Sequence, residues 1–311
     1  MNKKVLITGI SGFIGQYLWL TRPEGVLLSG TCRQPDNRIQ NFFEKPVSNQ
    51  ADVLPYDLLR DPAAQLKEQH PDIIIHAAAM ANLGMCEKEP ELAARVNAKA
   101  TEQLAVWSAD RGIRLIFLST DIVFKGDHPP YTEDSRPDPV NVYGKTKLAA
   151  ESALTDIMKD YATIRIALGL GRGLGKTSNF MDWFLQRLDH KTEIPLFYDE
   201  IRTPTAVMYL AEAIWKISLG NETGVFHAAG ADSLSRYELG LSMCELLGRG
   251  HDLIKPVSIM SMADYRRPVD VSLKSVRTVN GESLSIPGIR QVLNETLKKQ
   301  SGMGMQTKDV K

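Results

Sequence analysis

The feature that most constrains this 311-residue chain is a strand pattern that runs into a glycine-rich turn and then into a helix pattern. Residues 4–8 (Lys-Val-Leu-Ile-Thr) are typical of a buried strand, and glycines spaced G-x-x-G-x-x-G follow before a helical run through Leu20. The commonest dinucleotide fingerprint is spaced G-x-G-x-x-G, but the physical roles are the same. Glycines here allow a tight turn, close approach of backbone N–H groups to a pyrophosphate, and close packing of helix on strand. An ordinary tight turn is the alternative; the flanking strand and helix favour a cofactor site at Gly9, Ser11, Gly12, Phe13, Ile14 and Gly15.

Strand and helix patterns continue to alternate through the first half of the chain. Further strand patterns occur at residues 26–31, 53–56, 72–76, 114–118 and 163–168, and helix patterns include residues 62–69 and 87–110. Such alternation specifies a parallel sheet covered by helices on both faces, with the site at the carboxyl ends of the strands. We therefore expect an α/β fold, with a Rossmann-type doubly wound parallel sheet over residues 1–168. A smaller C-terminal substrate-binding lobe is expected mainly over residues 169–300, with some segments returning to the core, and a disordered tail over residues 301–311.

Composition excludes several classes of protein. Lys plus Arg equals Asp plus Glu, at 37 each, which argues against a protein that binds nucleic acid through its charge. The three cysteines and six histidines show neither a disulfide framework nor the spacing of a metal site. The longest apolar runs are far shorter than the roughly 20 residues that span a bilayer, and no signal peptide is visible. We expect a cytoplasmic protein without a metal, a nucleic-acid partner or a membrane partner.

Residues at the strand ends predict which dinucleotide binds. The second strand ends at Cys32-Arg33, where an acidic residue would bind a ribose 2′-hydroxyl and an arginine suits a 2′-phosphate instead. NADP(H) is therefore favoured over NAD, with a solvated surface role for Arg33 as the alternative. The other expected cofactor contacts are a carboxylate near the adenine, small residues against which the cofactor lies flat, and an asparagine that faces the sheet. These residues are Asp57, Leu58, Ala77, Ala78, Ala79 and Asn97.

A tyrosine and a lysine four residues apart predict the chemistry. Tyr143 and Lys147 lie near the start of a helical run, so their side chains project from one helix face. A phenol, whose pKa is ordinarily about 10, can act as a general acid toward a carbonyl oxygen when a neighbouring cation stabilises its phenolate. The same spacing also occurs on ordinary helix surfaces, but the strand end at Thr120 converges on the same crevice and favours catalysis. A proline-rich loop at residues 128–139 lies between them and is expected to cover the substrate.

Four segments, taken in order, resemble the extended short-chain dehydrogenase/reductases. They are Thr-Gly-Ile-Ser-Gly-Phe-Ile-Gly (8–15), His-Ala-Ala-Ala (76–79), Leu-Ser-Thr-Asp-Ile-Val-Phe-Lys-Gly (118–126) and Tyr-Gly-Lys-Thr-Lys (143–147). Within that group the chain is most similar to the dTDP-4-dehydrorhamnose reductases, through residues 119–126, 141–144, 202–205, 267–268 and 272–273. The resemblance implies that Thr120 hydrogen-bonds the substrate carbonyl oxygen and that Tyr143 protonates it. Lys147 would bind the nicotinamide ribose and lower the pKa of Tyr143, and Ser119 is the nearest rival to Thr120.

The resemblance also implies a reaction and leaves alternatives to it. The reaction is NADPH-dependent reduction of the keto group of a nucleotide-activated sugar, as in dTDP-rhamnose biosynthesis. Related 4,6-dehydratases carry Asp-Glu where this chain has Asp121-Ile122, and an isoleucine cannot transfer a proton. The alternatives are a nucleotide-sugar epimerase, or a non-catalytic NADP-binding regulatory subunit similar to the methionine adenosyltransferase β subunit. A homodimer is the candidate assembly.

The substrate pocket departs from the family pattern. Leu168 stands where the rhamnose reductases typically have a tryptophan, and residues 80–84 replace a common Tyr-Thr-x-Val-Asp. The cofactor chemistry therefore transfers better than the identity of the sugar. The segment 169–177 lacks the first glycine of a P-loop and is expected to be a mobile substrate loop. Arg172 and Lys176 are either available to a diphosphate or plain surface charges. The expected substrate contacts are Asn82, Thr120, Asn179 and Arg202, the last as a diphosphate contact.

Overall fold

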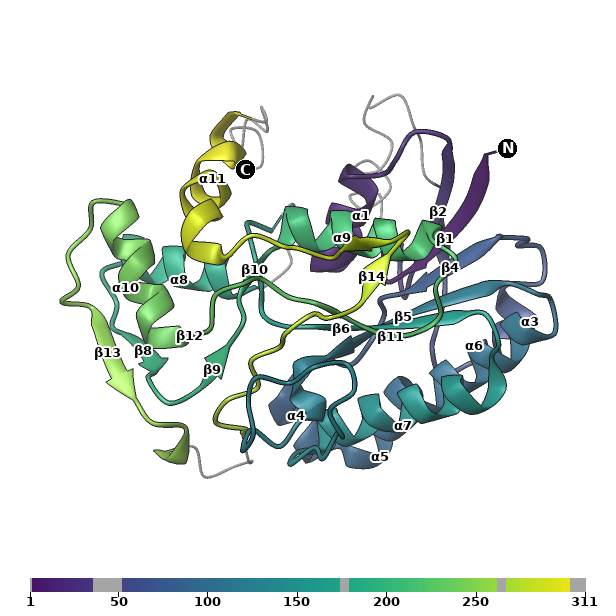
Figure 1. Cartoon of the computed structure of the whole chain (residues 1–311), viewed down its shortest axis with the longest axis horizontal. Helices are drawn as coiled ribbons and strands as arrows, with labels where there is room; N and C mark the ends of the chain where they lie inside the picture. Colours follow the sequence, from purple (N-terminus) through teal and green to yellow (C-terminus); the bar gives the residue numbers. More distant parts are fainter. Residues whose placement is uncertain (1, 36–51, 174–178, 262–266, 303–311) are drawn as a thin grey trace.

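A seven-stranded parallel sheet forms the centre of the molecule in the computed structural model, which describes residues 2–35, 52–173, 179–261 and 267–302 (Figure 1). Every pair of neighbouring strands is parallel. Chain order reverses between β1 and β4, which places a crevice at the carboxyl ends of these two strands. This is the Rossmann-type fold predicted from the alternation of patterns. The strands, from one edge to the other, are β3 (Asp52–Pro55), β2 (Val26–Cys32), β1 (Lys3–Thr8), β4 (Ile73–His76), β5 (Arg114–Thr120), β6 (Tyr161–Ile166) and β11 (Gly224–Ala228).

Helices cover both faces of the sheet because successive strand residues point to opposite sides. On one face α1 (Phe13–Leu20) and α9 (Val207–Leu219) pack against residues such as Ile7. On the other face α6 (Ala100–Ala109) and α7 (Val142–Ile157) pack against residues such as Leu6, with the short α3 (Pro62–Gln65) nearby. Figure 1 shows these two layers above and below the sheet.

The helical stretch expected at residues 87–110 is broken into pieces. It comprises α4 (Leu83–Lys88), α5 (Pro90–Ala93), a π-helix (Ala94–Lys99) and α6. Glu89 precedes a proline and adopts φ −129° and ψ 64°, outside the helical region, because a proline disfavours the α conformation in the residue before it. The π-helical turn contains Asn97, which is buried.

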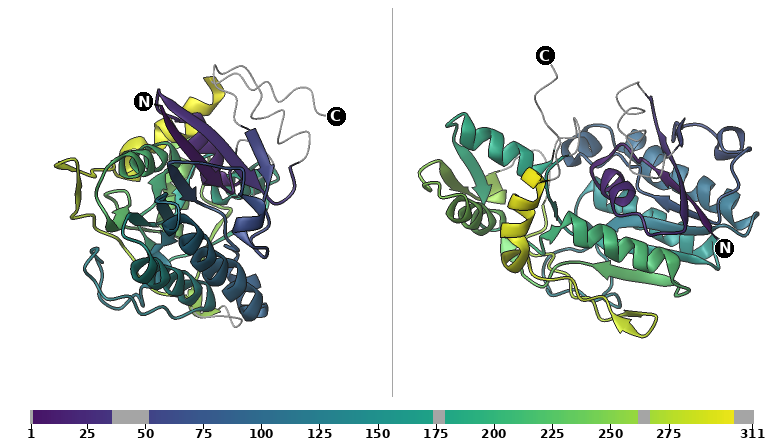
Figure 2. Two further views of the ribbon diagram at one scale, coloured as in Figure 1. Left: turned by 90° about the vertical axis from the view of Figure 1, so that its right-hand side faces the viewer. Right: turned by 90° about the horizontal axis from the view of Figure 1, so that it is seen from above.

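A smaller lobe lies beside the sheet domain (Figure 2) and has a hydrophobic core of its own. Its elements are α8 (Phe180–Asp189), β8 (Ile194–Phe197), α10 (Arg236–Leu246), β13 (Ile254–Val257) and α11 (Ile289–Gly302). Between α8 and α10 the chain returns to the first core through α9 and β11. The smaller lobe is therefore assembled from separate stretches of sequence.

Short strand pairs join the two cores. β7 (Gly169–Leu170) pairs with β10 (Thr205–Ala206), and β9 (Ile201–Arg202) pairs with β12 (Leu234–Ser235). A separate hairpin of β14 (Thr278–Val279) and β15 (Glu282–Ser283) places Val279 in the first core. The 3-10 turns η2 (Asp121–Val123) and η3 (Ile259–Ser261) complete the elements.

Some boundaries differ from the predicted ones. The second strand of the smaller lobe, β13, ends at Val257, and η3 follows it. The loop expected from residue 169 begins with β7, and residues 174–178, which include Lys176, lie outside the described part of the chain. Ser301 and Gly302 belong to α11 rather than to a disordered tail, and residues 303–311 lie outside the described part. Within the described residues no helix is long and apolar enough to cross a bilayer.

Candidate active site

The glycine-rich turn sits at the crevice between β1 and β4. Gly9 has φ +73°, and a Cβ there would lie 2.9 Å from the backbone of Ala78, so only glycine fits without strain. A Cβ at Gly15 would lie 2.5 Å from the carbonyl oxygen of Gly9. Gly12 is the N-cap of α1 without a side-chain cap, and no acidic residue lies in the first turn of that helix. The helix N-terminus is therefore open to an anionic group.

The other expected cofactor residues lie along the carboxyl edge of the sheet. Arg33 is exposed at the end of β2, and Ala77, Ala78 and Ala79 are half-buried after β4. Asp57 is half-buried after β3, where its Oδ1 accepts the N–H of Leu59 at 3.0 Å. Leu58 packs partly into the core on the α6 and α7 face.

Asn97 is buried between the chain that follows β4 and helix α7. Its Oδ1 accepts the N–H of Met80 at 2.8 Å, and its Nδ2 donates to the carbonyl oxygen of Met80 at 3.0 Å and to Thr146 Oγ1 at 3.1 Å. Both amide hydrogens are therefore used within the protein. The expectation that Asn97 contacts the cofactor gives way to a role in fixing the chain after β4 and joining it to α7.

His76 is a buried, neutral imidazole beneath the same edge. Its Nδ1 lies 2.6 Å from Thr8 Oγ1, and its Nε2 lies 3.1 Å from Thr101 Oγ1. Thr101 donates its hydrogen to the carbonyl oxygen of Asn97 at 2.7 Å, so it can only accept from His76, which places the imidazole proton on Nε2. Burial lowers the pKa of His76 to about 3, with the charge of Lys147 acting in the same direction. His76 is thereby a structural link rather than a proton donor at neutral pH.

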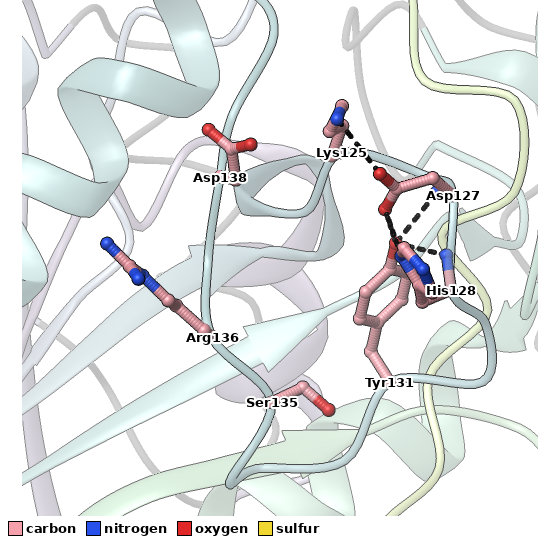
Figure 3. A pocket seen from close by; sticks show the side chains of 7 residues that line it. All are labelled: Lys125, Asp127, His128, Tyr131, Ser135, Arg136 and Asp138. Carbon is pink, nitrogen blue, oxygen red and sulfur yellow. Dashed lines mark hydrogen bonds and ion pairs between the residues drawn. The ribbon is translucent and has the colours of Figure 1, made fainter.

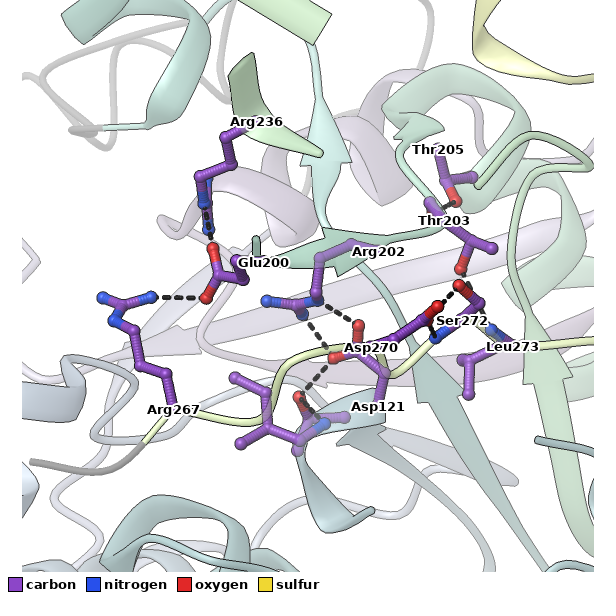
Figure 4. Close-up of polar contacts among 12 residues, drawn as sticks. Asp121, Glu200, Arg202, Thr203, Thr205, Arg236, Arg267, Asp270, Ser272 and Leu273 are labelled. Carbon is purple, nitrogen blue, oxygen red and sulfur yellow. Dashed lines mark hydrogen bonds and ion pairs between the residues drawn. The ribbon is translucent and has the colours of Figure 1, made fainter. Parts of the chain in front are cut away.

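Thr120 ends β5 at the mouth of the crevice. Its hydroxyl donates to Asp121 Oδ1 at 3.1 Å and accepts the N–H of Ile122 at 3.3 Å. Both oxygens of the fully buried Asp121 carboxylate are bound by Nε and Nη2 of Arg202 (Figure 4). Burial acts to lower the pKa of Arg202, but the charges of Asp121 and Glu200 outweigh it and raise that pKa. The pair with Asp121 uses Nε and Nη2 of Arg202, and contact of this guanidinium with a diphosphate stays a prediction.

Tyr143 and Lys147 project from the first turns of α7. Asn141 caps this helix by accepting the N–H of Gly144 at 2.8 Å, and Glu87 Oε1 accepts the N–H of Val142 at 2.8 Å. The Thr120 side chain acts on the Tyr143 phenol and lowers its pKa, so the two side chains lie near one another. Their joint role in catalysis stays a prediction.

The electrostatics of this pair differ from the expected ones. Burial, and then the charge of Asp121, raise the pKa of Tyr143 above its ordinary value, while Arg202 and Thr120 act against the rise. Lys147 is buried with its Nζ 3.9 Å from the centre of the Phe117 ring. Burial lowers the pKa of Lys147 to about 7, and Glu151 opposes the decrease. The pKa of Tyr143 is thus raised, and the expected lowering by Lys147 is not found.

Ser119, the rival hydroxyl, points away from Tyr143. It donates to Glu151 Oε1 at 2.5 Å, and Glu151 forms a buried ion pair with Arg165 at 2.7 Å. Thr120 is therefore the hydroxyl that meets the tyrosine.

A cluster of buried charges extends from Arg202 into the second lobe (Figure 4). Glu200 binds Arg236 at 2.5 Å and Arg267 at 2.6 Å. Burial acts to raise the pKa of Glu200, but the nearby arginines outweigh it and lower that pKa to about 2. Three guanidinium groups thus face two carboxylates, which leaves one positive charge in excess. Sequence patterns did not single out Glu200 or Arg236, because their partners come from distant segments.

Asn82 and Asn179, expected to contact the substrate, act as helix caps. Asn82 Oδ1 accepts the N–H of Met85 at 2.9 Å at the start of α4. Asn179 Oδ1 accepts the N–H of Asp182 at 3.0 Å, and its Nδ2 donates to the Asp182 carboxylate at 2.5 Å. Arg172 pairs with the same carboxylate at 3.2 Å. Asn82 is exposed, so its Nδ2, unlike that of Asn179, stays available to a ligand.

The proline-rich loop after η2 is anchored rather than loose. The Tyr131 oxygen accepts the backbone N–H groups of residues 126, 127 and 128 at 2.9, 2.9 and 3.0 Å, and the Tyr131 N–H donates to the Ser272 carbonyl at 2.8 Å. The loop borders a hollow of about 280 Å³ whose lining includes Lys125, Asp127 and Arg136 (Figure 3). Contacts with His128 and Lys125 hold the pKa of the Asp127 carboxyl well below its usual range. Covering of a substrate by this loop stays a prediction.

Comparison with known proteins identifies the family. The model of the RmlD substrate binding domain matches residues 3–301. The chain belongs to this family. The solved structure of a dTDP-4-dehydrorhamnose reductase from Bacillus anthracis, in complex with NADP, superimposes on this RmlD-family chain with a TM-score of 0.80 at 26% identity, and the match covers 96% of this chain and 100% of that one.

Two curated relatives point to different roles within the RmlD family. The "Probable low-salt glycan biosynthesis reductase Agl14" of Haloferax volcanii is 30% identical over 89% of this chain and 91% of its own length. The methionine adenosyltransferase 2 subunit beta of Xenopus laevis is 27% identical over 86% of this chain and 79% of its own length. The family thus includes sugar-nucleotide reductases and a subunit of another enzyme.

Proposed function

We propose that this protein reduces the keto group of a nucleotide-activated sugar with NADPH, most simply that of a dTDP-4-keto-6-deoxysugar. The observation that carries the proposal is the meeting of Tyr143 and Thr120 at the carboxyl end of β5, on the edge of the sheet that bears the glycine-rich turn. The reductase names of the Haloferax and Bacillus proteins support it.

The residues at the crevice fit a dinucleotide phosphate. Gly9, Gly12 and Gly15 leave room beside the uncapped N-terminus of α1, where a pyrophosphate would accept backbone N–H groups. Arg33, exposed at the end of β2, is placed for a 2′-phosphate. Bound NADPH would supply the hydride that reduces the carbonyl carbon.

The side chains of the protein would supply the proton and the orientation. Tyr143, kept protonated by its surroundings, donates its phenolic hydrogen to the carbonyl oxygen as that oxygen gains charge. Lys147, buried one helical turn away, binds the cofactor ribose, and the nearby anionic cofactor favours its charged form. Arg236 and Arg267, with 17% and 13% of their side chains exposed, are better placed than Arg202 to contact a diphosphate.

A regulatory role is the second candidate, and the Xenopus relative favours it. Retention of Thr120, Tyr143 and Lys147 in one constellation favours an enzyme. A non-catalytic subunit would bind NADPH and a larger enzyme without consuming the cofactor.

The deciding measurement is NADPH consumption with a panel of dTDP-, UDP- and GDP-4-keto sugars. We expect turnover with one sugar in the wild type and a loss of at least about 100-fold in Tyr143→Phe, because general-acid catalysis typically contributes that much. Both proteins should bind NADPH equally. Tyr198→Phe is the matched control, since Tyr198 is an exposed tyrosine in the second lobe. Binding of NADPH without reduction of any sugar would refute the reductase assignment.

A further inference from the structure

Residues 169–173 pack directly on the helix that begins at the glycine-rich turn. Phe13 is the first residue of α1, and a Cβ at Gly169 would lie 3.3 Å from its ring. Gly171 is buried, and a Cβ there would lie 2.5 Å from a valine side chain of α9 and 3.3 Å from the oxygen of Tyr17. This stretch is therefore held closely against α1 and α9.

The backbone of Arg172 is held by a buried tyrosine. Tyr17 lies one turn along α1 from Phe13, and the two rings meet edge to face with 5.5 Å between their centroids. The hydroxyl of Tyr17 donates to the carbonyl oxygen of Arg172 at 2.8 Å. Because Tyr17 is only 1% exposed and its ring is packed in the first core, this hydrogen bond fixes the backbone of Arg172 relative to α1.

The side chain of Arg172 is held from the smaller lobe. Its Nε lies 3.2 Å from Oδ1 of Asp182, in the first turn of α8. Oδ2 of Asp182 accepts the N–H of Gly173 at 2.6 Å and Nδ2 of Asn179 at 2.5 Å. The carboxylate thus shares its charge among three donors, and the positive N-terminus of α8 lies at the same place. The side chain of Arg172 stays 45% exposed.

An arginine held in this way is suited to an anionic ligand. A guanidinium presents a planar set of donors that matches the oxygens of a phosphate group. Ordering a long, exposed side chain costs rotamer freedom, and here the ordering takes place before any ligand binds. Arg172 is held at its carbonyl by α1 and at Nε by α8, so its position depends on both parts of the fold.

We propose that Arg172 binds a diphosphate at the junction of α1 with the smaller lobe, and that Tyr17 is a positioning residue that holds Arg172 for this contact. The inference deepens the proposed function and rests on it for the ligand, because NADPH and a nucleotide-activated sugar each carry a diphosphate. The two sources share one chemistry, and the binding measurements distinguish them.

The first test measures equilibrium binding and needs no turnover. Calorimetry gives the Kd of NADPH and, separately, those of dTDP, UDP and GDP. We expect Arg172→Met to raise the Kd of NADPH or of a nucleoside diphosphate by about tenfold, because hydrogen bonds between charged groups contribute that much, and Arg172→Lys to raise it less. An increase for NADPH assigns Arg172 to the cofactor, and an increase for a nucleoside diphosphate assigns it to the sugar nucleotide. Unchanged constants for all four ligands would overturn the inference.

Arg187→Met is the matched control for the arginine. Arg187 lies in the last turn of the same helix, α8, where its Nη1 donates to the carbonyl oxygen of Glu193 at 2.5 Å. Its replacement removes an equal charge from the smaller lobe at the far end of that helix. The control should leave all four dissociation constants unchanged, and an equal increase in both variants would mean that net charge alone is responsible.

The second test separates positioning from general stability. Tyr17→Phe removes the hydroxyl and keeps the ring, and it should raise the same Kd by about fivefold, since a hydrogen bond is lost. In the Arg172→Met background it should cause no further increase, because Tyr17 acts on the ligand through Arg172. A tyrosine with a merely structural role would have the same effect with and without the arginine. That result would overturn the positioning role.

Tyr161→Phe is the matched control for the tyrosine. The hydroxyl of Tyr161 donates to Thr155 Oγ1 at 3.0 Å at the start of β6, so this variant also loses one hydrogen bond. It should leave the dissociation constants unchanged in both backgrounds.

Kinetics distinguish failure of this inference from failure of the proposed function. If the wild type reduces a sugar, Arg172→Met should raise KM for the ligand that it contacts more than it lowers kcat, because the contact is made before and during the reaction. If the wild type binds NADPH but reduces no sugar, the proposed function fails. Calorimetry with the four ligands still decides whether Arg172 binds a diphosphate.

Discussion

Single residues at the crevice carry unusual protonation states. Lys147 is a buried cation whose pKa is lowered to about 7 by burial, so the folded protein resists its protonation. Since the unfolded chain binds that proton up to about pH 10, folding stability should rise with pH between these two values and be lowest below pH 7. Burial of a protonated Lys147 therefore lowers the free energy of unfolding at acidic and neutral pH.

Replacement of Lys147 by methionine should remove this cost. We expect Lys147→Met to be more stable than the wild type at pH 6, by about 5 kcal/mol at most, because one pKa unit corresponds to about 1.4 kcal/mol. Near pH 10 the difference should almost disappear. Urea unfolding at the two pH values measures it, and an equal difference at both values would show that the ammonium is not the cause. The variant should also bind NADPH more weakly.

Sequence patterns identified the candidate site residues themselves, but not the residues with which they form ion pairs. Tyr143 and Lys147 were predictable because helical spacing is local, and Thr120 because parallel strands end at one edge. The pair of Arg202 with Asp121 was not predicted, because the two residues lie 81 residues apart in sequence. Pairings across such distances depend on topology, which residue types alone do not reveal.

At the scale of elements, the start of α7 sets the position of the catalytic tyrosine. Asn141 caps the helix two residues before Tyr143. Asn141→Ala should lower the free energy of unfolding by about 1 kcal/mol and also reduce kcat, because the first turn would fray. Ser235→Ala is the matched control, since Ser235 caps α10 in a capping box of the second lobe.

The comparison of these two cap variants separates stability from positioning. Both should lose similar stability in chemical unfolding, but only Asn141→Ala should slow NADPH consumption. Equal activity in the two variants would mean that the cap does not position Tyr143.

The strands of the sheet were predictable to within about two residues, whereas the division of residues 83–109 into four helical pieces was not, because it depends on local competition around Pro90 and Asn97.

At the scale of the whole molecule, the predicted boundary at residue 168 does not separate two independent folding units. α9 and β11 come from residues 207–228 and yet complete the first core and the edge of the sheet. A fragment of residues 1–168 should therefore lack α9, one of the two helices that cover this face, and fail to reach the native state. Circular dichroism and limited proteolysis, compared with the full chain, test this; a cooperative, protease-resistant fragment would contradict it. The sequence indicated segments that return to the core, but it did not show which ones.

The late position of α9 also matters while the chain is being made. When residue 168 leaves the ribosome, six strands of the sheet have already emerged, with apolar side chains such as Ile7, Ile75 and Ile164 directed at a helix that does not yet exist. Because domains generally fold as units and exposed apolar surface promotes aggregation, the nascent chain passes through a stage at which this face is uncovered. The fraction of nascent chains that fold correctly therefore depends on how quickly the next sixty or so residues are translated. This is a requirement on the rate of synthesis and not on the stability of the folded protein.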